Sequence, residues 1–222
     1  NGDFSFTALN GFLGDDTFEY TVTDGADTDT ASVTISVDAP TGALMGDNTA
    51  NTLMGTSNSD IMYGLEGNDT LRGSYGADSL YGGAGNDQLY GQQGEDLVEG
   101  GEGDDTLYGN AGNDIYVYTS GHDIFSDNVN EVAGIDEINM PIGVTEADLT
   151  FTRTSAADLQ IDVAGLGSIL IKNQFYASNG AYSIERIRFA DNSTIDLMTK
   201  EYVGQGTSGN DNWSGIVAEI GR

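Results

Sequence analysis

The chain has 222 residues, with 36 Asp and Glu against 7 Lys and Arg, a formal net charge of −29, 32 glycines and no cysteine. This balance excludes a nucleic-acid binder, because neutralising phosphates requires clustered Lys and Arg, and it excludes a disulfide framework. The sequence contains no run of about 18 apolar residues that would predict a membrane span. It also does not open with the Lys- or Arg-led apolar segment of a cleaved signal peptide. We expect a soluble chain whose charge is compensated by a cation, because so much like charge opposes compaction.

Residues 1–38 are expected to form a hairpin. Two runs alternate apolar and polar residues, Phe18–Val22 and Ala31–Val37, with Asp24 and Gly25 between them, which predicts two half-buried strands. The runs resemble the last strands of cadherin-like or immunoglobulin-like modules of large bacterial surface proteins. A complete sandwich needs about 100 residues, so the resemblance implies a partial domain and a chain that is a fragment of a longer polypeptide. A hairpin that only caps the next region stays open. Residues 39–45, which include Ala39-Pro40-Thr41-Gly42, are predicted as a linker.

Residues 46–117 carry a nine-residue period. Glycine recurs at every ninth residue from Gly46 to Gly109, for eight units. The sixth place of each unit is Asn51 in the first and Asp in the rest, and the eighth place is apolar or, in the last unit, Tyr116. Each unit therefore predicts a tight glycine turn followed by a short strand with one inward side chain. Two units make an eighteen-residue coil, and stacked coils predict a right-handed parallel β-roll, a kind of β-solenoid.

The sixth-place acids are expected to stack. Equivalent residues of adjacent coils lie about 4.8 Å apart. One ladder then holds Asp60, Asp78, Asp96 and Asp114, and the other holds Asp69, Asp87 and Asp105. Like charges at that distance repel by roughly 1 kcal/mol at the dielectric constant of water and roughly 3 to 4 at an effective value of 20, so the metal-free roll is expected to be unstable. Hard oxygen ligands without thiols or clustered imidazoles favour Ca²⁺ over Zn²⁺ or Cu²⁺, and Mg²⁺ demands a stricter octahedron.

The block resembles the RTX nonapeptide G-G-x-G-x-D-x-U-x of proteins secreted by type I systems, most completely at Gly82–Tyr90 and Gly100–Tyr108. In this family several Ca²⁺ ions lie between successive turns, held by sixth-place aspartates and carbonyls of the glycine loops. The resemblance implies that the side-chain ligands are Asp60, Asp69, Asp78, Asp87, Asp96, Asp105 and Asp114. It implies loop contributions from Gly64, Gly67, Gly73, Gly76, Gly82, Gly85, Gly91, Gly94, Gly100, Gly103 and Gly112. The first two units depart from the pattern at Thr49, Asn51 and Asn58, which puts the sites at that end in doubt. A flexible Gly/Asp-rich linker is disfavoured, because a disordered chain has no reason to keep an apolar residue at every ninth place.

Past Val117 the nine-residue rule is expected to stop, and residues 118–204 are expected to cap the roll, since repeat arrays need covered ends. Strands are predicted at residues 149–153, 159–163, 168–172, 184–189 and 194–197, between turns at 164–165, 179–180 and 191–192. Thr145 is expected to cap a short helical turn together with Asp148. Residues 147–151 and 184–191 resemble the haemolysin-type calcium-binding-protein-related region. Residues 206–215 fit the nonapeptide again, so 205–222 are predicted to start a second RTX block, with Asp211 as a weak ligand candidate and Trp213 at the inward place.

Catalysis is not expected. The single histidine, His122, lies in the segment Ser120–Asp123, but serines beside acids are unavoidable at this composition, and no nucleophile-elbow pattern is present. Abundant paired carboxylates are uninformative about glycosidase chemistry. Neither proline follows an aspartate, so the Asp-Pro self-processing of some RTX proteins is not expected.

Four tyrosines at the ninth place are a second candidate site. Tyr63 and Tyr81 are expected to stack on one face of the roll, and Tyr90 and Tyr108 on the opposite face. Outward aromatic rings can stack on sugars, whereas ordinary cross-strand ladders contribute some 0.2 to 1 kcal/mol per pair. The ladder interpretation is favoured.

The sequence therefore predicts an all-β chain: a parallel β-roll with a β-rich C-terminal cap and a partial β-sandwich hairpin at the N-terminus. The expected function is a non-catalytic, calcium-dependent folding segment of a large secreted or cell-surface bacterial RTX protein, most like an adhesin. Such a roll stays open where Ca²⁺ is scarce and folds outside the cell at millimolar Ca²⁺. The open alternatives are an accessory region of a secreted hydrolase (protease, lipase or lyase) and a carbohydrate-binding module. Partners other than calcium, namely glycans, a surface receptor or further copies joined end to end, also stay open.

Overall fold

The computed structural model describes residues 13–23, 27–127, 135–175 and 184–199. The chain divides into two compact units, residues 1–43 and 44–222, and each is described by itself. The expected all-β fold is confirmed, because the described ranges hold strands and a single 3₁₀ turn, η1 (Glu146–Asp148). In this part of the chain no helix has the length and apolar character needed to span a membrane.

The first unit contains the predicted hairpin. Strands β1 (Gly14–Thr23) and β2 (Thr28–Val37) pair antiparallel, with Phe18 opposite Val33. The turn residues Asp24 and Gly25 lie outside the described residues. The expected alternation is present where side chains can be described, because Phe18 and Ile35 are partly buried between exposed neighbours. Val33, at 36% exposed, is more open than expected, since a two-stranded ribbon has no second sheet to cover its apolar face.

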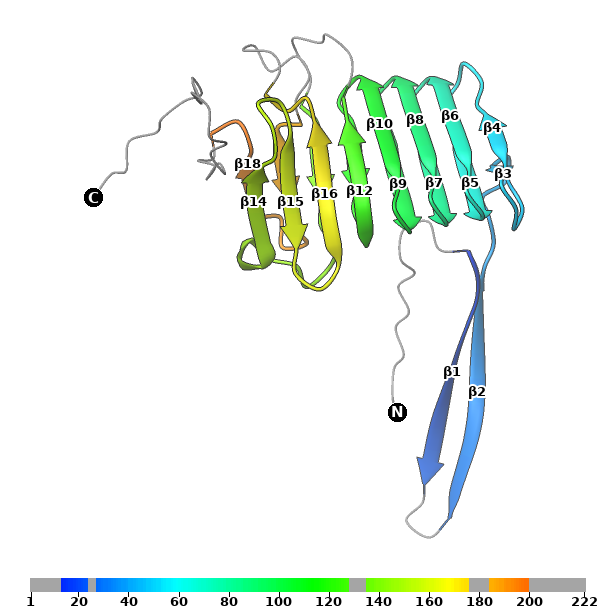
Figure 1. Cartoon of the computed structure of the whole chain (residues 1–222). Coiled ribbons are helices and arrows are strands. Elements are labelled where there is room, and N and C mark those ends of the chain that lie inside the picture. Colours follow the sequence, from blue (N-terminus) through cyan, green and yellow to red (C-terminus); the bar gives the residue numbers. More distant parts are fainter. Residues whose placement is uncertain (1–12, 24–26, 128–134, 176–183, 200–222) are drawn as a thin grey trace. The chain divides into compact units, whose positions relative to one another are not determined.

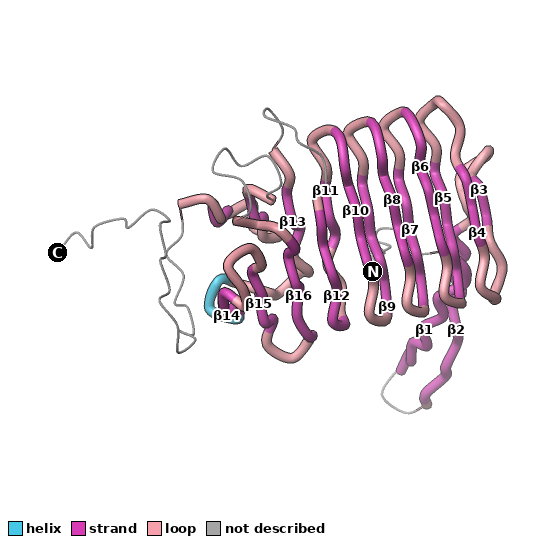
Figure 2. Tube along the Cα trace, turned by 45° about the horizontal axis from the view of Figure 1, so that its top comes forward, coloured by secondary structure: helices cyan, strands magenta, loops and turns pink. Residues whose placement is uncertain are grey.

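The second unit opens with the predicted β-roll, in which consecutive strands alternate between two parallel sheets (Figure 1). The strands of the roll are β3 (Leu44–Met45), β4 (Thr52–Met54), β5 (Ile61–Glu66), β6 (Thr70–Tyr75), β7 (Ser79–Ala84), β8 (Gln88–Gln93), β9 (Leu97–Glu102), β10 (Thr106–Ala111), β11 (Ile115–Val117) and β12 (Gly121–Ser126). Strands of adjacent coils pair with a shift of eighteen residues, as Leu71 with Leu89, which confirms the predicted coil. Figure 2 shows the turns along both edges of the flattened coils.

The eighth-place side chains form the core between the two sheets, as predicted. Met62, Leu71, Leu80, Leu89, Val98, Leu107 and Tyr116 are all buried completely. The same core continues with Phe125, Ile138 and Ile187 into the region after the repeats. Burial of one apolar side chain per nine residues is a thin core, so the turns must contribute much of the roll's stability.

The nine-residue register continues one unit beyond Val117, which corrects the expectation that it stops there. Strand β12 pairs parallel with β10, and Leu107 stands opposite Phe125, again eighteen residues apart. Asp123 therefore takes the sixth place of this unit, and Phe125 takes the eighth. The sequence pattern hid this unit because Tyr118 stands where the first glycine was expected.

The region after the roll, called the cap here, extends the same two sheets. Its strands are β13 (Glu137–Asn139), β14 (Leu149–Arg153), β15 (Leu159–Val163), β16 (Gly167–Lys172), β17 (Arg186–Arg188) and β18 (Thr194–Asp196). β13 and β16 pair parallel with β11 and β12, whereas β14, β15 and β18 pair antiparallel and end the sheets. The predicted strands are confirmed, with the one at 184–189 shorter than expected.

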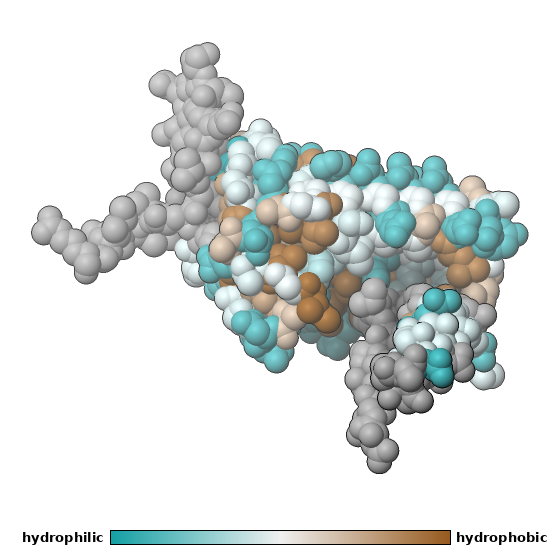
Figure 3. All heavy atoms as spheres, turned by 90° about the horizontal axis from the view of Figure 1, so that it is seen from below, coloured by the Kyte–Doolittle hydropathy of each residue, from teal (hydrophilic) through white to brown (hydrophobic). Residues whose placement is uncertain are grey.

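The capping box predicted for the short helical turn of the cap is confirmed. The Thr145 N–H and hydroxyl donate to Asp148 Oδ2 at 2.9 and 2.8 Å. The turn at 179–180 and the nonapeptide-like segment with Asp211 and Trp213 lie outside the described residues. Figure 3 shows brown, hydrophobic side chains gathered toward the cap end, and regularly spaced teal residues along one margin of the roll.

Candidate metal centre

The turns of the roll use glycine for two different physical reasons. Fourth-place glycines have positive φ, for example 134° at Gly85, a conformation that other residues rarely adopt. First-place glycines are instead required by space. A Cβ on Gly82 would lie 2.3 Å from Asp87 Oδ2 and 2.4 Å from the carbonyl oxygen of Gly100. The glycines named from the sequence are therefore placed at the turns, the first-place ones beside the acids.

The predicted aspartate ladders are present on the two edges of the roll. In each ladder the Oδ1 atom of one aspartate accepts the backbone N–H of the sixth-place residue one coil earlier. The Asp69 N–H donates to Asp87 Oδ1 at 2.7 Å, and the Asp78 N–H donates to Asp96 Oδ1 at 2.8 Å. The same bond links the pairs 51–69, 60–78, 87–105 and 96–114. The structure thus places all seven aspartates named from the sequence in the two predicted ladders.

The second carboxylate oxygens of the inner turns lack a protein partner. The Oδ2 atoms of Asp69, Asp78, Asp87, Asp96 and Asp105 are buried, and within the described ranges none of them accepts a hydrogen bond. A buried carboxylate oxygen without a donor costs free energy unless a cation or a proton compensates it. The turns therefore need a positive charge that the described residues do not supply.

A carbonyl oxygen from the next coil converges on the same place as the carboxylates of Asp69, Asp78, Asp87 and Asp96. Beside Gly64, Gly73, Gly82 and Gly91, the point where a Cβ would stand lies 2.2 to 2.4 Å from the aspartate Oδ2 and 2.4 to 2.8 Å from the next coil's first-place glycine oxygen. Ca²⁺ takes carboxylate and backbone carbonyl oxygens in flexible geometry. Groups of three or more His, Cys, Asp or Glu side chains suited to a metal do not occur among the described residues. The donor set fits Ca²⁺, provided that backbone carbonyls complete it.

Burial shifts the titration of the ladder carboxylates. Desolvation raises the pKa of Asp87 to about 7, with repulsion from Asp105 and Asp69 adding to it and the hydrogen bond from the Asp69 backbone opposing it. Desolvation also raises the pKa values of Asp96 and Asp105 to about 6. Between about pH 6 and 7 the metal-free ladders therefore take up protons in part, and a bound cation would replace them.

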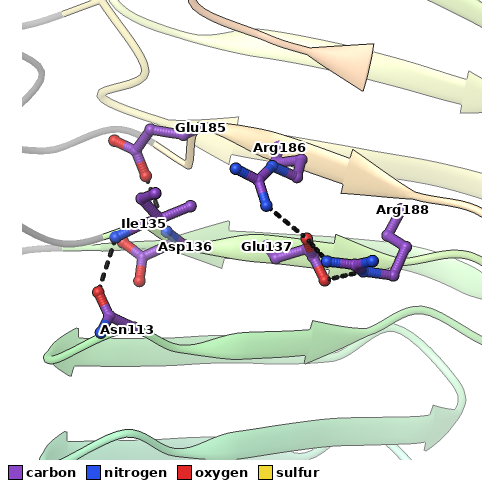
Figure 4. Close-up of polar contacts among 7 residues, drawn as sticks. All are labelled: Asn113, Ile135, Asp136, Glu137, Glu185, Arg186 and Arg188. Carbon is purple, nitrogen blue, oxygen red and sulfur yellow. Dashed lines mark hydrogen bonds and ion pairs between the residues drawn. The ribbon is translucent and has the colours of Figure 1, made fainter. Parts of the chain in front are cut away.

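Sequence reasoning missed two members of the ladders, Asp123 and Asp136. Asp123 Oδ1 accepts the Asp105 N–H at 2.9 Å, and Asp136 Oδ1 accepts the Asp114 N–H at 2.8 Å. Asp123 could have been found, because it lies nine residues after Asp114. Asp136 could not, because a longer connection separates it from Asp114. Glu185 Oε2 then accepts the Asp136 N–H at 2.8 Å and continues the pattern into the cap (Figure 4).

The predicted tyrosine stacks are present. The ring centroids of Tyr63 and Tyr81 are 4.9 Å apart with planes inclined by 12°, and those of Tyr90 and Tyr108 are 4.8 Å apart and inclined by 3°. The Arg72 guanidinium lies 4.3 Å from the Tyr90 ring centroid. A sugar needs a free ring face to stack on, and these rings stack face to face along the sheet. The geometry therefore favours cross-strand ladders over a sugar platform.

His122 lies at the start of β12, next to the ladder residue Asp123. Its Nδ1 atom is 3.0 Å from the Ser168 hydroxyl, and its backbone N–H donates to Asp104 Oδ1 at 2.9 Å. Both contacts are exposed. This environment matches a surface hydrogen-bonding residue.

Comparison with known families identifies three segments. Residues 45–74, 63–98 and 90–125 match the RTX calcium-binding nonapeptide repeat, residues 158–199 match the haemolysin-type calcium binding protein related domain, and residues 1–36 match a bacterial Ig domain. Among solved structures, the chain is similar to the solution structure of the AlgE6R3 subunit from the Azotobacter vinelandii mannuronan C5-epimerase. That match has 19% identity and a TM-score of 0.32, and it covers 79% of this chain and 98% of the other. The comparison with curated proteins gave no match.

Residues 45–125 are thus RTX calcium-binding repeats folded as a β-roll, and repeats of this kind bind several Ca²⁺ ions. They are typical of secreted bacterial proteins. The matched range extends to Phe125, the eighth place of the additional unit, in agreement with the strand register. The N-terminal hairpin belongs to a segment with the pattern of a bacterial Ig domain.

Proposed function

We propose that this chain is a non-catalytic, calcium-triggered folding segment of a large secreted or cell-surface bacterial protein with an adhesive role. Its task in this proposal is to remain open during export and to become a rigid β-roll outside the cell. Binding that occurs only in the folded state adds its free energy to folding. Extracellular Ca²⁺ then supplies the stability that the metal-free chain lacks.

The observation that carries the proposal is the double row of buried carboxylates. Each inner aspartate uses one oxygen to bond the coil before it, while its second oxygen is buried and has no hydrogen-bond donor among the described residues. With a net charge of −29, the chain provides few cations of its own. A divalent ion between coils would satisfy the second oxygens and cancel the repulsion within each row.

The adhesive role is supported by what precedes the roll. A bacterial Ig domain pattern covers residues 1–36, and tandem sandwich modules are expected in a surface protein. The alternative, a roll that accompanies a hydrolase, requires a catalytic segment elsewhere in the parent protein. A carbohydrate-binding role of the tyrosines is less well supported, because their rings stack on one another.

Calcium-triggered folding is tested by measuring how compact the chain is with and without calcium. Small-angle scattering and circular dichroism should be measured on the 222-residue chain in chelator and then across a calcium titration at neutral pH. We expect an expanded chain with little β-structure in chelator, and a cooperative compaction as Ca²⁺ approaches millimolar concentration. Magnesium at the same concentration is the control and should not compact the chain, because it requires a stricter octahedron and loses water reluctantly. A chain that is already compact in chelator, or that folds equally well with magnesium, would contradict the proposal.

The adhesive part is tested with the calcium-loaded chain on beads. Attachment of the beads to bacterial or host cell surfaces should require Ca²⁺ and should disappear in chelator. Soluble hydrolase substrates incubated with the same protein should remain unchanged. Calcium-dependent turnover of such a substrate without attachment would favour the hydrolase alternative.

A further inference from the structure

The two outer faces of the roll carry different side chains. On the sheet of β5, β7 and β9, the outward side chains include Ile61, Leu97 and Glu99. On the other sheet, β6, β8 and β10 lie side by side (Figure 1), and burial of alternate residues directs three side chains of each strand outward. We call these residues the polar face: Thr70, Arg72, Ser74, Gln88, Tyr90, Gln92, Thr106, Tyr108 and Asn110. No acid is among them, although residues 46–117 contain 13.

Arg72 is the one basic residue of the roll, and it lies within the polar face. In the described part of the cap, Lys172, Arg186 and Arg188 each pair with an acid, and Arg153 donates to a backbone carbonyl. The Arg72 guanidinium makes no hydrogen bond or ion pair with the described residues. A chain with a net charge of −29 thus keeps an unpaired cation on a face without acids.

Two tyrosines hold the Arg72 guanidinium in place. Arg72 stands opposite Tyr90 in the strand register, and its guanidinium lies 4.3 Å from the Tyr90 ring centroid. The Tyr90 ring stacks in turn on Tyr108, with centroids 4.8 Å apart. A guanidinium that rests on a ring keeps the N–H donors of its rim available to another group. The rings therefore position the cation, which agrees with their interpretation as a cross-strand ladder.

The rest of the polar face offers neutral hydrogen-bonding groups. The Tyr90 hydroxyl donates to Gln88 Oε1 at 3.1 Å, so the side-chain N–H groups of Gln88 can still donate. Gln92 carries a second amide, and Thr70 and Thr106 carry hydroxyl groups. Amides and hydroxyls both donate and accept hydrogen bonds, as the hydroxyl groups of a sugar do. Their arrangement around one cation favours a partner that is mostly neutral and rich in hydroxyl groups.

The charge of the chain limits how many anionic groups that partner can carry. A carboxylate binds a guanidinium through two parallel hydrogen bonds, and Arg72 can hold one carboxylate in this way. No other residue of the polar face is basic. A net charge of −29 repels a densely charged polyanion. The face therefore fits an isolated carboxylate among neutral groups.

An extended peptide is a poorer partner for this surface. Such peptides commonly bind by adding a strand to an unpaired sheet edge. The strands β6, β8 and β10 are paired on both sides, because β4 precedes them and β12 follows them in the sheet. Their backbones offer no free edge, so recognition must come from the outward side chains.

We propose that the polar face binds a saccharide in which one carboxylated sugar stands among neutral sugars. Arg72 holds the carboxylate, and the glutamines and threonines around it hold hydroxyl groups. This inference rests on the proposed adhesive role and names the class of partner for it. Because β6, β8 and β10 belong to the roll that calcium is proposed to fold, binding should require Ca²⁺.

The test uses a glycan array of matched pairs that differ by one carboxylated sugar, such as lactose and sialyllactose. The 222-residue chain is applied in saturating calcium and in chelator, and circular dichroism checks that each variant is folded. In calcium we expect the wild type to bind carboxylated members at least about tenfold more tightly than their neutral counterparts. Arg72→Gln should lose this preference. Lys172→Gln is the control, because it removes the same charge from a strand of the same sheet, and it should keep the preference.

The inference is overturned if no carboxylated glycan binds, or if Arg72→Gln keeps the wild-type preference. Should Arg72→Gln fail to fold, Arg72→Lys decides the matter. It keeps the charge but not the two parallel bonds, so an undiminished preference in this variant would overturn the inference. An acidic peptide that competes as strongly as the carboxylated glycan would also overturn it, in favour of a protein partner.

The bead assay separates this inference from the adhesive role on which it rests. Beads carrying Arg72→Gln that attach to cells as well as wild-type beads would leave the adhesive role intact and refute the role of Arg72. Wild-type beads that attach to no cell would refute the adhesive role, while the array still decides whether the polar face binds a carboxylated saccharide.

Discussion

The roll and the cap share two continuous sheets, yet they compensate their acidic residues differently. Residues 46–117 contain 13 Asp and Glu and a single basic residue, Arg72, whereas residues 136–197 contain 9 acids and 4 bases. In the cap, Lys172 pairs with Asp158 at 2.7 Å, and Arg188 donates to Glu137 with an Nη2–Oε2 distance of 2.9 Å. In the roll, the buried carboxylates stack on one another. One pair of sheets can thus have its acidic residues compensated by metal ions at one end and by the chain's own basic residues at the other.

The largest expected effect is the loss of stability when a glycine is replaced by alanine in a crowded turn of the roll, compared with an open turn of the cap. Gly85 has positive φ, and a Cβ there would lie 1.8 Å from the Gly67 carbonyl oxygen, whereas Gly165 has positive φ with nothing within 4 Å. Gly85→Ala should destabilise the calcium-loaded chain by more than about 4 kcal/mol. Gly165→Ala should cost about 1 kcal/mol, for backbone strain alone. Chemical denaturation in saturating calcium measures both, and equal costs would show that the stacked turns have room to relax.

A charge removed from the roll should matter more than a charge removed from the cap. Asp87→Asn keeps the backbone bond of its row but removes a buried oxygen that fits a metal. It should raise the calcium midpoint of folding about tenfold or more, which corresponds to about 1.4 kcal/mol. Asp158→Asn in the cap should leave that midpoint unchanged and cost about 0 to 1 kcal/mol, because Lys172 is partly exposed. A calcium titration followed by circular dichroism would contradict the account if the two midpoints moved together.

Acid should partly replace calcium in the roll. The pKa of Asp87 in the folded chain is raised to about 7 by burial, above the ordinary value of 3.8, so the metal-free folded state holds protons that the unfolded state has released. The stability of the metal-free chain should therefore increase as the pH falls from 7.5 to 5, and it should be lost again as the pH rises through about 7. Circular dichroism in chelator measures this as β-structure that forms when the pH falls from 7.5 to 5, because the metal-free chain is expected to be largely unfolded at neutral pH. A metal-free chain that is less stable at pH 5 than at pH 7.5 would contradict the burial of unpaired carboxylates.

The smallest effect on calcium uptake is expected from the tyrosine stacks. The double variant Tyr63→Ala with Tyr81→Ala should leave calcium uptake intact and change no affinity on a glycan array. Its stability should still fall, because Tyr63 is only 7% exposed and its lost burial adds to the about 0.2 to 1 kcal/mol of the cross-strand pair. A clear loss of glycan binding would restore the sugar-platform interpretation.

Most of the roll could be predicted from the sequence, because three places of each nine-residue unit keep the same kind of residue. Glycine at the first place, aspartate at the sixth and an apolar residue at the eighth fix the coil length and the strand register before any contact is known. The period failed at Tyr118, where a different first residue hid the unit containing Asp123. The strands of the cap could be located from their alternating apolar and polar residues. Which strands pair with one another could not be predicted. Strand β16 pairs with β12 across 46 residues, and connections of such lengths follow no repeat.

The metal turns show a second limit of sequence reasoning. Asp60 and Asp87 hold the same place in their units, and the repeat pattern assigns them the same role. Their surroundings differ, because the Thr56 N–H donates to Asp60 Oδ2, whereas Asp87 Oδ2 accepts no hydrogen bond from the described residues. The insertion of the Tyr116 hydroxyl between Gly109 and Ser126 is likewise a contact between separate coils, and its residue type alone predicted only an inward ring.

If metal ions hold together the stacked carboxylates of the roll, hydrogen exchange of its backbone amides must depend on calcium. Amide protection should be compared residue by residue at neutral pH in chelator and in millimolar calcium. We expect calcium to increase the protection of β5 to β10 far more than that of β14 to β16. Equal protection of β5 to β10 with and without calcium would show that metal ions do not hold the roll together.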